Sequence, residues 1–230
     1  MAAEGMGSKM KVSTWISGLA VAAVMAVSAP VTAHAGSESG NFMVRVGASA
    51  VLPDSKVTAA GLTGEVDNQF IPSATLTYFL SKNLAVELYC CFTKHDIELN
   101  GAGKVADTWI FPPTLTLQYH FDGMGPLKPY IGAGVTWMHF FKEKTHLAGT
   151  TSVEIDDAFG FALQAGVDIS MGGGWYLNAD VKKIFIDTEA TYSNGVIAKA
   201  DIDPWIISAG IGYRFNLGDL FHRTSHEPLK

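Results

Sequence analysis

Charge, cysteine and long apolar runs are all scarce in this sequence of 230 residues. Charged residues make up 17% of the chain, below the usual quarter. The 16 basic residues are outnumbered by 22 acidic ones, and the arginines are Arg45, Arg214 and Arg223. An acidic chain with so little arginine does not fit a nucleic-acid partner, and none is predicted.

The two cysteines, Cys90 and Cys91, are adjacent. Neighbouring side chains of a strand point to opposite faces, so a disulfide between these two is not expected. We interpret them as small hydrophobic residues, one on each face. They give no redox or metal signal, and the sequence predicts no cofactor.

Beyond residue 35, no apolar run reaches the ~20 residues that a membrane-spanning helix needs. Inside a bilayer, only helices and closed barrels satisfy every backbone polar group. If the mature chain lies in a membrane, it must therefore do so as a closed β-barrel.

The first 35 residues form a separate segment. Lys9 and Lys11 precede a short apolar run, which is followed by Ala33-His34-Ala35. This order is typical of a secretory signal peptide, so residues 1–35 are predicted to be removed by cleavage near Ala35. The alternative is an N-terminal membrane anchor, although the run is shorter than a spanning helix requires.

Period-two alternation dominates the rest of the chain. Between Leu84 and Lys94, one row of alternate residues is apolar and the other is mixed. Seven further stretches repeat the pattern with aromatic residues near the ends of the apolar row, which is typical of a barrel wall that faces lipid. The eight predicted strands are Asn41–Val51, Phe70–Leu80, Leu84–Lys94, Thr108–Phe121, Pro129–Phe141, Ala158–Ser170, Trp175–Glu189 and Pro204–Phe215.

The connections between these strands alternate in length. Long polar segments (52–69, 95–107, 142–156, 190–203) alternate with short turn-forming ones (81–83, 122–128, 171–174). Bacterial outer-membrane barrels show this alternation. We therefore predict an all-β fold, an eight-stranded antiparallel transmembrane β-barrel over residues 36–215 with four long outer loops and three short periplasmic turns. A C-terminal periplasmic tail over residues 216–230 follows, and the predicted location is the outer membrane of a Gram-negative bacterium.

In this orientation, the lipid-facing aromatic residues fall into two belts, as expected at the two membrane interfaces. Lys183 is the exception on the lipid-facing rows. It lies near the outer end of its strand, where it can extend to the interface or mark a change of register. The periplasmic belt is Phe42, Tyr78, Tyr119, Phe121, Trp175, Tyr213 and Phe215, and the outer belt is Phe70, Phe92, Trp109, Phe111, Trp137, Phe159 and Trp205.

The inward rows divide the barrel interior into two halves. The outer half is apolar and contains Ile71, Ile110, Met138, Phe140, Ile184, Ile186 and Ile206. The periplasmic half is polar and contains Arg45, Glu87, Gln118, Gln164, Asp168, Asp180, Lys182 and Arg214.

An eight-stranded barrel is just wide enough for its side chains to fill. We interpret the polar set as an ion-paired plug, so an open aqueous pore is not expected. The apolar set has two interpretations, which the sequence leaves open. It is either the simple packing of a filled barrel or a pocket that takes small hydrophobic molecules from outside.

Pro112 and Pro113 lie inside a predicted strand. Proline cannot donate to a strand ladder and is confined to edges and bulges. A lateral gap into the lipid and a plain bulge both fit this position.

Pro112-Pro113-Thr114-Leu115, then Lys128-Pro129-Tyr130-Ile131-Gly132-Ala133-Gly134, then Asp203-Pro204-Trp205 and Gly212-Tyr213-Arg214-Phe215 occur in this order. Together, from about Gly40 to Phe215, the chain resembles the OmpW family of outer-membrane proteins, including its AlkL-like members. The resemblance implies a hydrophobic channel that is closed toward the periplasm and releases small apolar solutes sideways. Such barrels commonly end at an aromatic residue that helps assembly, here Phe215, whereas this chain continues to Lys230.

We therefore expect passive uptake of small apolar molecules, with a structural or host-interaction barrel as the alternative. An enzyme is not predicted, because the inward-facing Ser73 and Ser208 have no histidine partner by spacing. The histidines and acids of the outer loops match no metal template. The expected partners are outer-membrane lipid, small hydrophobic solutes and the barrel-assembly machinery.

Overall fold

The computed structural model describes residues 40–59, 61–101, 103–147 and 149–217. The described residues all belong to one compact unit within Ala35–Lys230. The predicted signal peptide and nearly all of the predicted tail lie outside the described residues. Within the described ranges, no helix is long and apolar enough to cross a membrane.

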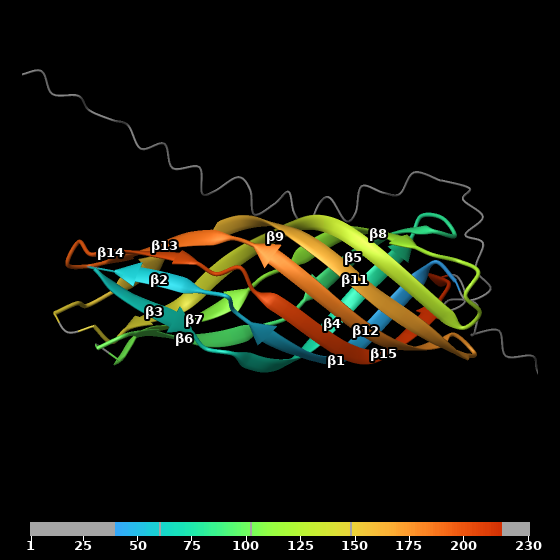
Figure 1. Cartoon of the computed structure of the whole chain (residues 1–230), viewed down its shortest axis with the longest axis horizontal. Coiled ribbons are helices and arrows are strands. Elements are labelled where there is room, and N and C mark those ends of the chain that lie inside the picture. Colours follow the sequence, from blue (N-terminus) through green and yellow to red (C-terminus); the bar gives the residue numbers. More distant parts are fainter. Residues whose placement is uncertain (1–39, 60, 102, 148, 218–230) are drawn as a thin grey trace, which may run out of the picture. The chain divides into compact units, whose positions relative to one another are not determined.

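Eight long strands form a closed antiparallel sheet (Figure 1). They pair in the order β9-β11-β12-β15-β1-β4-β5-β8, and β8 pairs again with β9, which closes the barrel. The predicted eight-stranded antiparallel fold is confirmed. The strands are β1 (Phe42–Leu52), β4 (Gln69–Phe79), β5 (Leu84–Cys90), β8 (Thr114–His120), β9 (Leu127–Thr145), β11 (Ala158–Gly172), β12 (Trp175–Phe185) and β15 (Trp205–Phe215).

Seven further strands lie within the four long outer connections and continue the wall beyond one end of the barrel (Figure 1). Together with the outer part of β9, they form an outer extension with the order β10-β13-β14-β2-β3-β6-β7-β9. Sequence analysis described most of these residues as polar connections, and assigned residues 93–94, 108–111 and 187–189 to the ends of its predicted strands. The strands are β2 (Lys56–Ala59), β3 (Leu62–Val66), β6 (Thr93–Leu99), β7 (Gly103–Phe111), β10 (Val153–Ile155), β13 (Asp187–Tyr192) and β14 (Ile197–Asp201).

The two faces of the barrel wall are inverted relative to a water-soluble barrel. On β8, the side chains of Thr114, Thr116 and Gln118 are buried in the interior. The intervening Leu115 and Leu117 are exposed on the outside. An apolar outer face around a polar interior is the arrangement expected of a wall in contact with lipid.

Aromatic rings gather on the outer face near both ends of the barrel, where the sequence predicted two belts. Trp175 and Tyr213 lie 4.9 Å apart between ring centroids at one end, and Phe92 and Phe111 lie 4.7 Å apart at the other. Lys183 keeps its register opposite Leu163 and Trp205, so it does not mark a register change. Its amine donates to the Asp203 carbonyl at 2.6 Å and therefore extends toward the outer end.

The predicted strand Thr108–Phe121 is interrupted at Pro112 and Pro113, between β7 and β8. Pairing of β5 with β8 ends at Tyr89–Thr114, and pairing of β6 with β7 begins at Thr93–Ile110. On the opposite side the wall stays joined, because the Trp137 amide donates to the Pro113 carbonyl at 3.1 Å. The prolines therefore interrupt the ladder on one side of their strand.

A longer interruption lies one strand further round the wall, between β4 and the β5–β6 segment. Pairing of β4 with β5 ends at Ala74–Cys90, and pairing of β3 with β6 begins at Val66–Ile97. No ladder pair joins residues 68–73 to residues 91–95 within the described chain. We call this interruption the β4–β6 seam.

Candidate functional site

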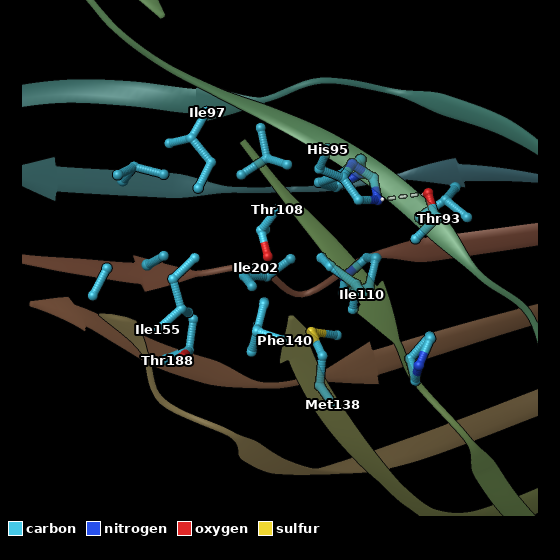
Figure 2. A pocket seen from close by; sticks show the side chains of 18 of the residues that line it. Thr93, His95, Ile97, Thr108, Ile110, Met138, Phe140, Ile155, Thr188 and Ile202 are labelled. Atoms are coloured by element: carbon cyan, nitrogen blue, oxygen red, sulfur yellow. Dashed lines mark hydrogen bonds between the residues drawn. The ribbon is translucent and has the colours of Figure 1, made fainter. Parts of the chain in front are cut away.

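An apolar cavity lies where the barrel meets the outer extension (Figure 2). Its volume is about 60 Å³, which corresponds to space for about four water molecules. Its lining comes from both parts of the wall and includes Val51, Pro53, Val57, Val66, Cys91, Ile97, Ile110, Pro112, Met138, Phe140, Ile155, Ile184, Ala190, Tyr192, Ala198, Ala200, Ile202, Pro204 and Ile206.

The structure brings the predicted apolar residues together at this cavity. Five of them line it, namely Ile110, Met138, Phe140, Ile184 and Ile206. The other two, Ile71 and Ile186, are buried in the same apolar cluster without lining the cavity. The alternation of β7, β9, β12 and β15 places the five lining side chains on the inner face, where they exclude water.

The outer extension supplies lining residues that sequence analysis missed. Val57, Ile155 and Ala198 point inward from β2, β10 and β14, all within segments interpreted as polar loops. On β2, the buried Val57 and Ala59 alternate with the exposed Lys56 and Thr58. The same alternation that identified the long strands was therefore present, but over only four residues.

Four polar side chains interrupt the apolar lining. Thr93, His95, Thr108 and Thr188 all border the cavity and are at most 9% exposed (Figure 2). Thr93 Oγ1 lies 3.1 Å from His95 Nε2, and His95 Nδ1 lies 3.1 Å from the Asp67 carbonyl oxygen. Burial lowers the pKa of His95 below its usual value, which favours the neutral ring.

Arg45 is the centre of the polar plug on the periplasmic side. Its Nε and Nη2 donate to the two oxygens of Asp168 at 3.0 and 2.6 Å. Its Nη1 donates to Glu87 at 2.9 Å and to Thr77 at 2.6 Å. A planar guanidinium in this bidentate geometry makes a strong, charge-assisted pair with a carboxylate.

A second set of contacts joins Glu87 to the opposite wall. Lys182 Nζ lies 3.2 Å from Glu87 and 2.5 Å from Asp180. Gln164 Nε2 donates to the same two carboxylates at 2.9 and 2.7 Å, and Gln164 Oε1 accepts from Gln118 at 3.1 Å. These contacts and those of Arg45 form one hydrogen-bonded network across the lumen.

Arg214, which the sequence also assigned to the plug, lies apart from this network. Its guanidinium carbon is 3.4 Å from the centre of the Phe79 ring, and its Nε donates to the Gly40 carbonyl at 2.7 Å. Phe79 belongs to a small buried cluster with Met43, Ala85 and Tyr176. The periplasmic end therefore has an apolar layer in addition to the polar plug.

Sequence analysis also missed neutral members of the plug. Tyr130 donates to Asp180 at 2.9 Å and accepts from Asn178 at 3.0 Å, and Asn178 also donates to Asp168 at 2.9 Å. Thr116 donates to Gln164 at 2.7 Å. Their position on inward rows was readable from the alternation, but a neutral side chain there gives no separate signal.

The plug leaves little free space and nearly balances its charge. Three carboxylates, Glu87, Asp168 and Asp180, face Arg45 and Lys182. A cavity beside them measures about 20 Å³, space for a single water. Each buried charge has an opposite partner, as burial in a low-dielectric interior requires.

Outside the cavity and the plug, the described residues give little sign of a catalytic or metal-binding site. Ser49 bonds to both Ser73 and Ser208 at 2.7 Å, so these inward serines bond to one another and not to a base. Among the residues that the structure describes, no group of three histidine, cysteine or acidic side chains is placed to hold a metal ion. The apolar cavity has the chemistry to bind small apolar molecules, and the polar plug has the chemistry to exclude ions.

Comparison with known proteins gives consistent matches. The OmpW family model matches residues 38–215. Outer membrane protein W of Vibrio cholerae is 35% identical over 217 residues, which cover 87% of this chain and 98% of that protein. Outer membrane protein AlkL of Ectopseudomonas oleovorans is 32% identical over 190 residues, 79% of this chain and 77% of that protein.

Among solved structures, the outer membrane protein OprG of Pseudomonas aeruginosa superposes with a TM-score of 0.72. The two sequences are 30% identical, and the match covers 77% of this chain and 97% of OprG. The strand arrangement described above is thus shared with a crystallographically determined outer-membrane barrel.

Proposed function

This chain belongs to the OmpW family, non-enzymatic β-barrels of the Gram-negative outer membrane, and from that premise we propose that it forms a narrow hydrophobic channel for small apolar molecules. The proposed uptake is passive. The solute enters from outside and collects in the apolar cavity. The lumen is closed toward the periplasm.

One observation carries this proposal: the apolar cavity is bordered on its periplasmic side by a complete polar network. Lys182 Nζ lies 4.8 Å from the centre of the Tyr89 ring, so the plug begins directly where the apolar cluster ends. An apolar solute that moved further inward would have to displace paired charges, which is strongly unfavourable. The favourable path therefore leaves the lumen sideways.

The interruptions of the wall support lateral release into the membrane. Pro112 and Cys91 line the cavity and border the break in the ladder. The β4–β6 seam begins at the same Cys91, and Phe70 and Phe92 beside it are 77% and 60% exposed. Because backbone pairing is absent there, side chains alone close the wall and can be displaced without breaking a ladder. We assign the exit to Pro112, Pro113 and this seam.

The sequence pattern also supports a proposal for how the chain is processed and inserted. We propose that residues 1–35 are cleaved as a signal peptide near Ala35 and that the barrel-assembly machinery inserts residues 36–215. The tail over 216–230 then remains in the periplasm. Outer-membrane lipid and small hydrophobic solutes are the partners of the mature barrel.

Uptake of an apolar probe into liposomes tests the proposal. Ile206 is 2% exposed and lines the cavity, so Ile206→Asp should reduce probe entry at least tenfold while the barrel still folds. Ile197→Asp is the matched control, because Ile197 is 52% exposed on β14 and should leave uptake unchanged. Normal uptake by a folded Ile206→Asp barrel would refute the proposal.

A structural or host-interaction role is the second candidate, favoured by the charged outer face of the extension. Lys104 pairs with Asp96 at 2.8 Å, and Lys199 pairs with Glu189 at 2.8 Å, all on strands beyond the barrel. Deletion of residues 146–151, most of the connection between β9 and β10, separates the two roles. Loss of adhesion with normal solute uptake would favour this second role.

A further inference from the structure

We infer that the apolar cavity selects solutes that carry one hydrogen-bond donor, such as a phenol, an indole or an alcohol, over isosteres that carry only acceptors. This inference rests on the proposed function and names its substrate class. It follows from where the hydroxyl protons of Thr93, Thr108 and Thr188 are directed.

The hydroxyl proton of Thr188 is donated to a backbone carbonyl in the wall of the cavity. Its Oγ1 lies 2.7 Å from the Asp156 carbonyl oxygen, and a carbonyl oxygen can only accept. Thr188 is therefore the donor of this bond. Its hydroxyl oxygen keeps lone pairs and has no second proton to offer.

Thr108, on β7, is in the same situation. Its hydroxyl lies 3.2 Å from the Trp109 carbonyl oxygen and 3.4 Å from that of Phe141. Both neighbours are acceptors, so the proton of Thr108 is shared between them. Thr108 is 1% exposed and borders the cavity, to which its oxygen can offer only lone pairs.

Thr93 is fixed by the tautomer of His95. His95 Nδ1 faces the Asp67 carbonyl oxygen at 3.1 Å, so Nδ1 carries the proton of the neutral ring. Nε2 is then an acceptor, and the Thr93 hydroxyl 3.1 Å away donates to it. Figure 2 shows this bond at the edge of the cavity, next to Ile110.

Three hydroxyl groups of the lining thus act as acceptors toward a guest, the fourth, that of Tyr192, can donate or accept, and the rest of the lining is mostly apolar. A solute with a donor can replace the hydrogen bond that it gave up to water at any of the three threonines, whereas an acceptor-only solute can bond only to the Tyr192 hydroxyl. A threonine that turned its proton to the guest would lose its bond to the wall. The expected preference is about fivefold to tenfold in Kd.

Equilibrium dialysis of indole and benzofuran against the barrel in lipid nanodiscs tests the inference. The two solutes differ by N–H against O in the same ring frame, and empty nanodiscs correct for partition into lipid. The wild-type barrel should bind indole at least fivefold more tightly than benzofuran. Equal binding of both above the empty discs would overturn the inference and leave the proposed channel standing.

Variants identify the groups responsible. Thr188→Val and Thr108→Val each remove a hydroxyl at nearly constant volume and should reduce the preference for indole at least twofold, with benzofuran binding unchanged. Ile155→Val in the lining and Thr58→Val on the exposed face of β2 are the controls and should keep the full preference. Tyr192→Phe should also keep it, because the inference assigns selection to the threonines. A preference that survives in both threonine variants, or that disappears in Tyr192→Phe, would overturn the inference, whereas absence of binding of either solute would instead contradict the proposed channel.

Discussion

The apolar cavity and the polar plug lie in the same closed wall and differ mainly in their inward-facing side chains. Both halves use period-two strands with lipid-facing apolar rows. In the cavity half, isoleucines such as Ile184 and Ile206 cover the inner face, whereas in the plug half Arg45 and Glu87 do so. Under the proposed function, one wall combines a solute-binding half with an ion-sealing half by a change of its inward residues alone.

The energetic consequences of change differ between the two halves. Apolar lining is non-directional, so it tolerates substitution at a cost that follows the volume lost. The plug is directional, and each of its charges depends on a partner that another strand provides. Substitutions in the plug should therefore have larger effects than those in the cavity.

The largest effect is expected for Arg45→Ala. This change leaves Asp168 and Glu87 without their principal partner in a buried position. We expect a loss of about 3–5 kcal/mol in the free energy of unfolding. Urea titration of the folded barrel, followed by tryptophan fluorescence, measures it.

Arg45→Lys is the matched control for this prediction, because it keeps the charge and loses the bidentate fork. It should lose less stability than Arg45→Ala. If Arg45→Ala unfolds at the wild-type urea concentration, the ion pairs of the plug do not stabilise the barrel and the contrast between the halves is wrong.

An intermediate effect is expected for Ile184→Ala at the cavity. Ile184 is fully buried, and its truncation enlarges the cavity that it lines. We expect a loss of about 2–4 kcal/mol in unfolding free energy, together with faster uptake of bulkier apolar solutes. The same urea titration and a liposome assay with solutes of graded size provide the measurements.

Ile207→Ala is the control for Ile184→Ala, since Ile207 is 51% exposed on the lipid-facing row of the same region. It should not change the size limit of uptake. An unchanged size limit in Ile184→Ala would mean that this cavity does not determine which solutes pass.

The smallest effect is expected outside both halves, at Asp107 in the outer extension. A hydrogen bond from His146, followed by the charges of Lys94 and Lys104, lowers the pKa of Asp107 to about 2. Because the folded pKa is depressed, the stabilisation is present above the unfolded value of about 4 and is lost as the pH falls toward 2. Asp107→Asn should cost about 1 kcal/mol at neutral pH and remove part of the acid sensitivity between pH 4 and pH 2.

The effect of salt distinguishes the ion pairs of the outer extension from those of the plug. The ion pairs of the outer extension are partly exposed, with Lys94 Nζ 3.4 Å from Asp107 and its side chain 45% exposed, so salt should weaken them. The plug is shielded from solvent ions. If salt weakens the plug as much as the extension, water reaches the plug and it is not a seal.

The barrel itself was predictable because a single physical rule decides it. Alternation with an apolar outer row, together with connections that alternate in length, is enough to predict eight antiparallel strands and their inward residues. Ile110 and Ile206 were assigned to the apolar half from this rule, and the structure places both at the cavity. Their role in uptake remains a prediction.

The pairings within the plug and the strands of the outer extension could not be predicted from the sequence. Arg45 bonds to Asp168, 123 residues away, and this pairing depends on how the barrel closes. In the outer extension, strands of three to five residues such as β10 and β14 are too short for alternation to stand out. The threonines around the cavity gave no signal, because only tertiary contacts show where each hydroxyl proton is directed.

The most direct test of the plug and cavity is the single-channel conductance of the purified barrel in a planar bilayer, with and without a small apolar solute. The contacts of Arg45, Glu87, Asp180 and Lys182 predict little or no ion current from the wild-type barrel and a perturbation of any residual current by the solute. A large steady current that the apolar solute leaves unchanged would show that the lumen is a continuous water path, and it would contradict both the seal and the pocket above it.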